Sequence, residues 1–133
     1  MLPSDRFTIG LLRDLASRLG KSDRVEAANR RLRAISQYEA FQQLRWVGKA
    51  GPQASAFLSA AMATDPGYAD PQFELGQINR EHGTTREAIG NFSTYLRLAP
   101  RGERALRAER FIVALQHPSW LARILGIDFR FQG

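Results

Sequence analysis

Cysteine is absent from the sequence, which excludes disulfides, thiolate metal ligands and a cysteine nucleophile. Long apolar runs without charge are also missing, so we expect no membrane-spanning helix. Near the N-terminus, charged residues such as Asp5, Arg6 and Arg13 interrupt the apolar core that a signal peptide requires. We therefore expect a cytoplasmic protein, with a periplasmic location as the alternative if a signal has been removed. A bacterial adaptor fits this composition.

Lysine is scarce, with two residues against 17 arginines, and the formal net charge is +6. A basic balance is typical of proteins that bind an anionic partner, such as nucleic acid, a membrane surface or an acidic protein. Nucleotide bias in a genome also favours arginine over lysine without any functional meaning. The composition alone leaves both explanations open.

Residues that usually carry catalysis or bind metals are few and scattered. The two histidines, His82 and His117, lie 35 residues apart, unlike the close pair of a zinc-protease helix. No glycine-rich phosphate loop is present, and the carboxylates, Glu74 among them, show no pairing beyond that of a solvated helix face. We therefore expect no catalytic residue, no metal site and no cofactor, and hence no enzyme.

Apolar residues recur with helical spacing nearly throughout the 133 residues, and no β-like alternation persists. We expect one all-α domain of about seven helices. The stretch 21–47 contains no glycine or proline, so it could form one long helix or two helices that bend near Ser36. We favour the break because the repeat described below requires one. Other helices are expected at 4–19, 52–63, 71–82, 84–99 and 103–116, and Pro118 opens a short last segment. The first helix carries an apolar face formed by Phe7, Leu11, Leu12, Leu15 and Leu19.

Helix ends are marked by residues with known preferences. Gly20 is placed to end the first helix, and Pro52 to open a later one. Two further starts have the spacing of a capping box, in which an acidic residue lies three positions after the cap. These pairs are Asp23 with Glu26 and Thr84 with Glu87.

A repeat of 34 residues relates the two halves of the stretch 35–102. Gly76 is expected to let two helices approach closely, and Pro100 fixes the exit of the chain because it cannot continue a helix. Each half is then one helix–turn–helix unit. A shift of 34 residues aligns Leu75 with Phe41, Ala88 with Ala54, Phe92 with Leu58, Tyr95 with Ala61 and Pro100 with Pro66.

The stretch 69–102 resembles the tetratricopeptide repeat family, whose units are helix pairs of this length. It departs from the family's pattern at Asn79, where an aromatic is usual, and at Tyr95, where a small residue is usual. The stretch 35–68 resembles it less, since Gln42 and Arg45 replace the usual glycine and aromatic. The resemblance of the better unit is carried by Leu75, Gly76, Gly83, Ala88, Phe92 and Pro100.

The resemblance implies a right-handed helical-repeat solenoid. Its parts would be degenerate N-terminal helices at 1–34, units at 35–68 and 69–102, and a capping helix with an apolar tail at 103–133. In such solenoids the first helix of each unit lines a groove that binds a peptide or partner protein. Phe73 and Trp46 are expected either in that groove or buried against flanking helices. The expected partner contacts are Trp46, Phe73, Gln77, Arg80, Arg104 and Arg107.

Arginine recurs at every third position from Arg101 to Arg110. This stripe is either a solvated helix face or a site for an acidic peptide, since arginine binds carboxylates through a two-pronged fork. The function expected is that of a non-enzymatic interaction module or scaffold, with assembly into homo-oligomers as a second route. The alternative is a helical-repeat nucleic-acid-binding protein, against which the scarcity of lysine counts.

Overall fold

The computed structural model describes residues 2–49 and 51–117, and the regular secondary structure there is entirely helical. The expectation of an all-α fold is therefore confirmed. None of the helices in the described residues is long and apolar enough to cross a membrane. The segment expected to follow Pro118 lies outside the described residues. The helices are α1 (Arg6–Arg18), α2 (Ser22–Trp46), α3 (Pro52–Thr64), α4 (Asp70–Glu81), α5 (Thr85–Leu98) and α6 (Ala105–Gln116).

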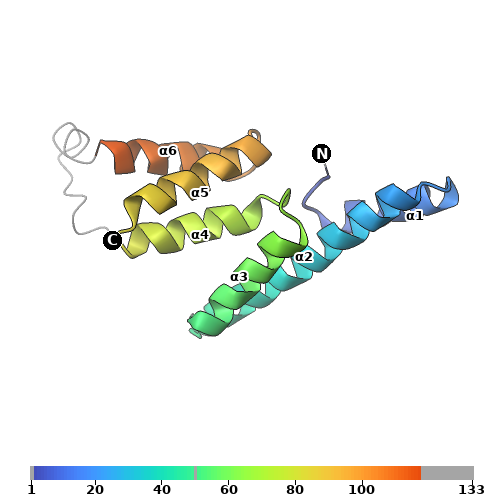
Figure 1. Ribbon diagram of the computed structural model, residues 1–133, viewed down its shortest axis with the longest axis horizontal. Helices are drawn as coiled ribbons and strands as arrows, with labels where there is room; N and C mark the ends of the chain where they lie inside the picture. Colours follow the sequence, from blue (N-terminus) through green and yellow to red (C-terminus); the bar gives the residue numbers. More distant parts are fainter. Residues whose placement is uncertain (1, 50, 118–133) are drawn as a thin grey trace. The chain divides into compact units, whose positions relative to one another are not determined.

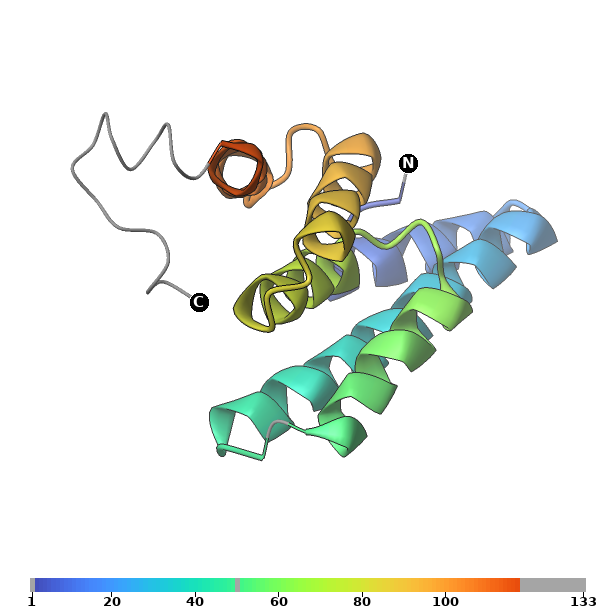
Figure 2. The same ribbon diagram turned by 60° about the vertical axis from the view of Figure 1, so that its left-hand side comes forward.

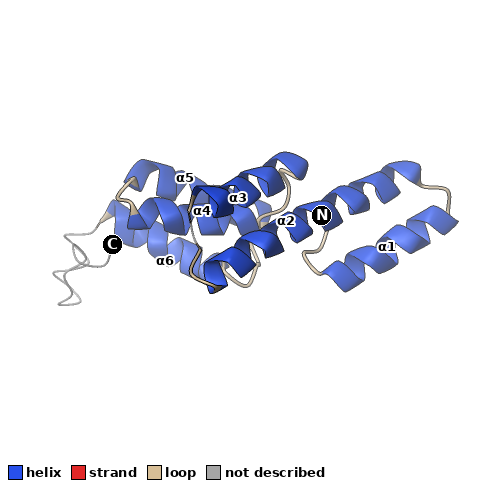
Figure 3. Cartoon of the chain, turned by 90° about the horizontal axis from the view of Figure 1, so that it is seen from below, coloured by secondary structure: helices blue, strands red, loops and turns tan. Residues whose placement is uncertain are grey.

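The chain forms two compact units, Met1–Pro71 and Gln72–Gly133. In the first unit, α1 and α3 each pack against the long helix α2, α1 along its first half and α3 along its second (Figure 1). Figure 3 shows α1 and α2 running antiparallel and joined by a short turn. In the second unit, α5 packs against α6, which Figure 2 views nearly along its axis. Ring contacts of Phe73 join α4 to both of these helices. The six helices thus pack in sequential pairs.

The apolar face of α1 is exposed. The helix instead buries Ile9 and Ala16. Gly20, with φ of +70°, follows its end, as expected. At its start the Asp5 carboxylate caps the helix by accepting from the backbone N–H of Thr8 at 2.7 Å. The exposed fractions along the apolar face are 73% for Phe7, 55% for Leu11, 42% for Leu12, 54% for Leu15 and 64% for Leu19.

Helix α2 is continuous, so the predicted break near Ser36 is wrong. The Ser36 hydroxyl donates to the carbonyl of Leu32 one turn earlier at 3.2 Å, which keeps the side chain on the helix surface without opening the backbone ladder. The predicted capping box is also wrong here. The helix begins at Ser22, with Lys21 in the cap position and no side-chain cap bond.

A buried arginine connects three segments of the first unit. Arg31 of α2 is 4% exposed and forms an ion pair with Asp65, which follows α3. Its guanidinium also donates to the backbone carbonyls of Leu2 and Pro3 at 2.9 and 2.8 Å. The same group lies over the ring of Tyr68, 5.2 Å from the ring centre. Arg31 therefore fixes the N-terminal segment and the loop after α3 against α2.

The close approach expected at Gly76 is confirmed. A Cβ atom at this position would lie 2.7 Å from Cε1 of Phe92, so α4 and α5 meet where only glycine fits. The unusual Asn79 belongs to a row of side-chain amides between the same helices. Asn79 donates to Asn91 at 2.7 Å, and Asn91 donates to Gln72 at 3.1 Å. Hydrogen bonds thus occupy the site where the sequence lacks an aromatic residue.

The predicted capping box at Thr84 is wrong, although Thr84 does occupy the cap position of α5. Its hydroxyl donates to the backbone carbonyl of Asn79 at 2.9 Å instead of capping the helix that follows. Pro52 opens α3, as expected.

Tyr95, the other departure from the family's pattern, reaches from α5 into the turn before α6. Its hydroxyl accepts from the backbone N–H of Arg104 at 3.2 Å. A Cβ atom on Gly102 would lie only 2.4 Å from that hydroxyl oxygen. The tyrosine fits because the turn residue beneath its hydroxyl is glycine.

Candidate functional site

The second unit has an aromatic core built by all three of its helices. The ring centre of Phe73 on α4 lies 5.4 Å from that of Phe92 and 5.5 Å from that of Tyr95, both on α5. Phe111 of α6 lies 5.1 Å from Phe92. These spacings are those of favourable aromatic pairs, which contribute beyond the apolar area they bury. The aromatic core therefore joins α4 to α6 directly, as well as joining both helices to α5.

Three arginines lie on the rings of this core. The guanidinium carbon of Arg80 on α4 is 4.5 Å from the ring centre of Phe111. Arg104, next to the start of α6, lies 5.1 Å from the ring centre of Phe73. Arg107 of α6 lies over both rings, at 5.3 and 6.0 Å. We call these five residues the arginine–aromatic cluster.

One carboxylate balances part of this charge. Glu74, beside Phe73 on α4, pairs with Arg104 at 3.0 Å. Its side chain is 6% exposed and that of Arg104 is 27% exposed. Breaking such a buried pair leaves a charge without compensation, so Arg104 is held mainly by the fold. The sequence-based view of Glu74 as part of a solvated face is wrong, because its partner is Arg104, which lies 30 residues further along the chain, just before α6.

Arg107 differs from Arg104 in its surroundings. It is exposed on the surface of α6, and it forms no ion pair with another residue in the part of the chain that the structure describes. Its guanidinium carries five N–H donors in a fixed fork that matches the oxygens of a carboxylate. Arg107 is therefore the member of the cluster best placed to bind a carboxylate from outside.

The structure brings four of the six expected contact residues into the cluster: Phe73, Arg80, Arg104 and Arg107. Gln77 lies on the same helix as Phe73 and Arg80, four and three positions away, and is half-buried. Trp46 belongs to the other unit, at the end of α2, and is 90% exposed. Whether any of these residues contacts a partner stays a prediction.

Phe73 is not an exposed anchor. Its exposed fraction is 0%, because α5 and α6 close over its ring. Of the two positions expected for it, the buried one is therefore the position observed. Phe73 therefore affects the surface only indirectly, because the guanidinium groups of Arg104 and Arg107 lie over its ring.

Groups that could bind a metal are not assembled in the described residues: no three histidine, aspartate or glutamate side chains there converge on one point. What the cluster offers is fixed positive charge beside apolar rings. This combination suits an anionic ligand that also has apolar or planar parts.

Comparison with protein-family models, with curated proteins and with solved structures finds no match for this chain. The resemblance to the tetratricopeptide repeat family therefore rests on the residues quoted above.

Proposed function

We propose that this chain is a non-enzymatic interaction module of the tetratricopeptide type, which binds an acidic peptide or protein segment on the arginine–aromatic cluster. The observation that carries the proposal is that three arginines, from α4, from the start of α6 and from α6 itself, lie over the rings of Phe73 and Phe111. The arginine–aromatic cluster requires two helices and a buried aromatic core to hold its residues together. A solvated stripe on a single helix would need neither.

The chemistry of the cluster favours carboxylates as the ligand groups. An arginine fork matches the two oxygens of a carboxylate, and the neighbouring rings add apolar contact for the rest of the peptide. Since Glu74 already engages Arg104, an incoming carboxylate would bind mainly to Arg107. A right-handed solenoid is part of the proposal, because in that arrangement α4 and α6 are the first helices of consecutive units and line one groove.

The competing function is nucleic-acid binding, which also uses arginine. Phosphate binding releases counterions, so its affinity falls steeply as salt rises. A peptide that binds through one or two carboxylates and apolar contacts loses much less affinity over the same range. Titrations with an acidic peptide and with single-stranded RNA, each at low and high salt, therefore separate the two functions.

The test uses fluorescence anisotropy with a panel of labelled peptides that are rich in aspartate and glutamate. We expect binding by the intact chain and a loss of at least about tenfold for Arg107→Glu, as for removal of a hydrogen-bonded charge pair. Arg107 is chosen over Arg104 because Arg104→Glu would place a second carboxylate beside the buried Glu74 and endanger the fold.

Arg97→Glu is the matched control, since Arg97 is an exposed arginine on α5 of the same unit. An equal loss in Arg97→Glu and Arg107→Glu would mean that only net charge matters and would contradict the proposal. Tight, strongly salt-dependent binding of RNA in place of peptide would favour the alternative function.

A further inference from the structure

The first unit has an apolar surface that none of its own helices covers. Four large apolar side chains of α1 and that of Leu19, which follows it, are each at least 42% exposed, and they run from Phe7 to Leu19. Twelve residues of helix span about 18 Å. Single exposed leucines are ordinary on a protein surface, but a continuous row of this length is typical of an interaction site.

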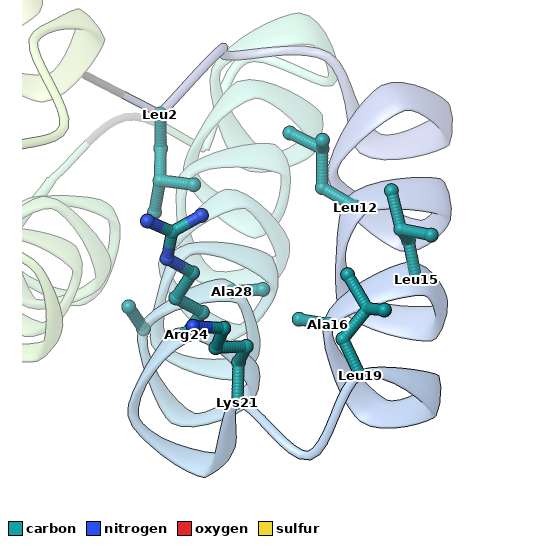
Figure 4. Close-up of a pocket in the computed structure, with 9 residues that line it drawn as sticks. Leu2, Leu12, Leu15, Ala16, Leu19, Lys21, Arg24 and Ala28 are labelled. Atoms are coloured by element: carbon teal, nitrogen blue, oxygen red, sulfur yellow. The ribbon is translucent and has the colours of Figure 1, made fainter.

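Part of this row borders a hollow between α1 and α2. The cavity has a volume of about 380 Å³, and Ala16 and Ala28 point toward one another across the helix contact (Figure 4). Small side chains at this contact leave a shallow floor that a third element can approach. The hollow is lined by Leu2, Leu12, Leu15, Ala16, Leu19, Lys21, Arg24, Ala27 and Ala28.

Both charged residues that line the hollow are basic. Lys21 and Arg24 lie on the α2 side of it, opposite the leucines of α1 (Figure 4). Neither forms an ion pair with another residue in the described ranges, 2–49 and 51–117. Asp14, the acidic residue nearest in sequence to these leucines, is engaged by its neighbour Arg13 at 3.3 Å. The groove is therefore apolar along its length and positive along one edge.

We infer that the α1–α2 groove binds an amphipathic helix of another protein, with leucine-like residues on one face and acidic residues along one flank. Such a helix places its apolar stripe on Leu12, Leu15 and Leu19 and its carboxylates against Lys21 and Arg24. Charge favours an acidic helix over a second copy of this chain, because a second copy would bring another Lys21 and Arg24 to the contact without a matching acidic flank in the hollow.

This site is independent of the arginine–aromatic cluster, since all of its residues belong to the first unit. The two proposals can therefore fail separately. Variants at Arg107 should leave the groove unaffected, and variants in the groove should leave peptide binding at the cluster unaffected.

The test uses two designed helical peptides of about 18 residues, enough to span the row. They carry the same leucine stripe, but one has glutamate along the flanks and the other lysine. In anisotropy titrations at low salt we expect the glutamate peptide to bind at least tenfold more tightly than the lysine peptide. Arg24→Glu should reverse this preference. Arg33→Glu should not, because Arg33 is an exposed arginine nine residues along α2 and so on its opposite side.

The apolar part is tested with Leu15→Glu, which should abolish binding, and with the milder Leu15→Ala, which should weaken it while circular dichroism confirms the fold. Leu106→Glu is the control, since Leu106 is a leucine of α6 with a similar exposed fraction, 57% against 54%. Equal binding of both peptides would overturn the inference, as would binding that Leu15→Glu leaves unchanged. Two further results would also overturn it: anionic vesicles captured while both peptides are ignored, or a dimer in light scattering that Leu15→Glu dissolves.

Discussion

Tyr68 shows how one buried side chain makes the first unit sensitive to alkaline pH. It is 3% exposed, and its ring meets that of Tyr38 edge-on at 5.8 Å. Burial raises the pKa of its hydroxyl above the ordinary value, and the neighbouring carboxylate of Asp70, to which it donates a hydrogen bond, raises the pKa further. The fold therefore favours the protonated hydroxyl of Tyr68 over the phenolate.

The sign of the pH dependence follows from that shift. In the unfolded chain Tyr68 loses its proton near pH 10, whereas in the folded chain it keeps it. The contribution of Tyr68 to the free energy of unfolding is thus complete below pH 10. As the pH rises further, this contribution falls by up to about 1.4 kcal/mol per pH unit. We expect urea titrations to show this fall, and to show a shallower one for Tyr68→Phe. An unchanged slope in that variant would assign the alkaline loss to other groups.

At the scale of the element, the contact between α4 and α5 depends on a missing side chain. Gly76→Ala adds a methyl group that meets the buried ring of Phe92, which is itself packed against Phe73 and Phe111. Alanine gains about 1 kcal/mol in helix propensity over glycine, but overpacking a core costs about 1–3 kcal/mol. Because Phe92 has little room to move, we expect net destabilisation and a lower Tm.

Gly90→Ala is the matched control for Gly76→Ala. Gly90 lies within α5, is exposed, and has open space where a Cβ atom would be. The same chemical change there should gain helix propensity without a clash and raise the Tm slightly. A rise in Tm for both variants would show that Phe92 adjusts freely and that the contact is loose.

The helices themselves could be predicted because apolar spacing and end signals are local properties. Gly20 and Pro52 mark helix ends correctly for this reason. The predicted break near Ser36 depends on the repeat rather than on any local helix breaker, and α2 continues through this position. Periodicity also located the apolar face of α1, but it cannot indicate whether another element covers that face. Whether another helix packs on this face depends on how all the helices are arranged in space, and the sequence of one helix does not determine that arrangement.

The same distinction applies to the candidate site. Arg104 and Arg107 stood out through their spacing along α6, and Arg80 through its place in the expected groove. Their common support by Phe73 and Phe111 is a contact between helices. The pairing of Glu74 with Arg104 likewise joins residues 30 positions apart, so no local pattern predicts it.

At the scale of the whole molecule, each unit has its own core and its own buried ion pair. Arg31 and Asp65 serve the first unit, and Arg104 and Glu74 the second. The sequence predicts one domain, and its stability would then be lost in a single cooperative step. Two compact units instead allow one unit to unfold while the other stays folded, so that the backbone amides of one unit lose their protection from hydrogen exchange first. A variant that damages only one ion pair distinguishes these cases.

Arg31→Met is that variant. It removes the partner of Asp65, whose side chain is 14% exposed, and the donor to the carbonyls of Leu2 and Pro3. Removing one member of a buried pair costs about 3–5 kcal/mol. If the units open separately, amide hydrogen exchange should accelerate in α2 and α3 by orders of magnitude and change little in α5 and α6. A uniform acceleration in all four helices would instead mean that both units unfold together, as a single domain requires.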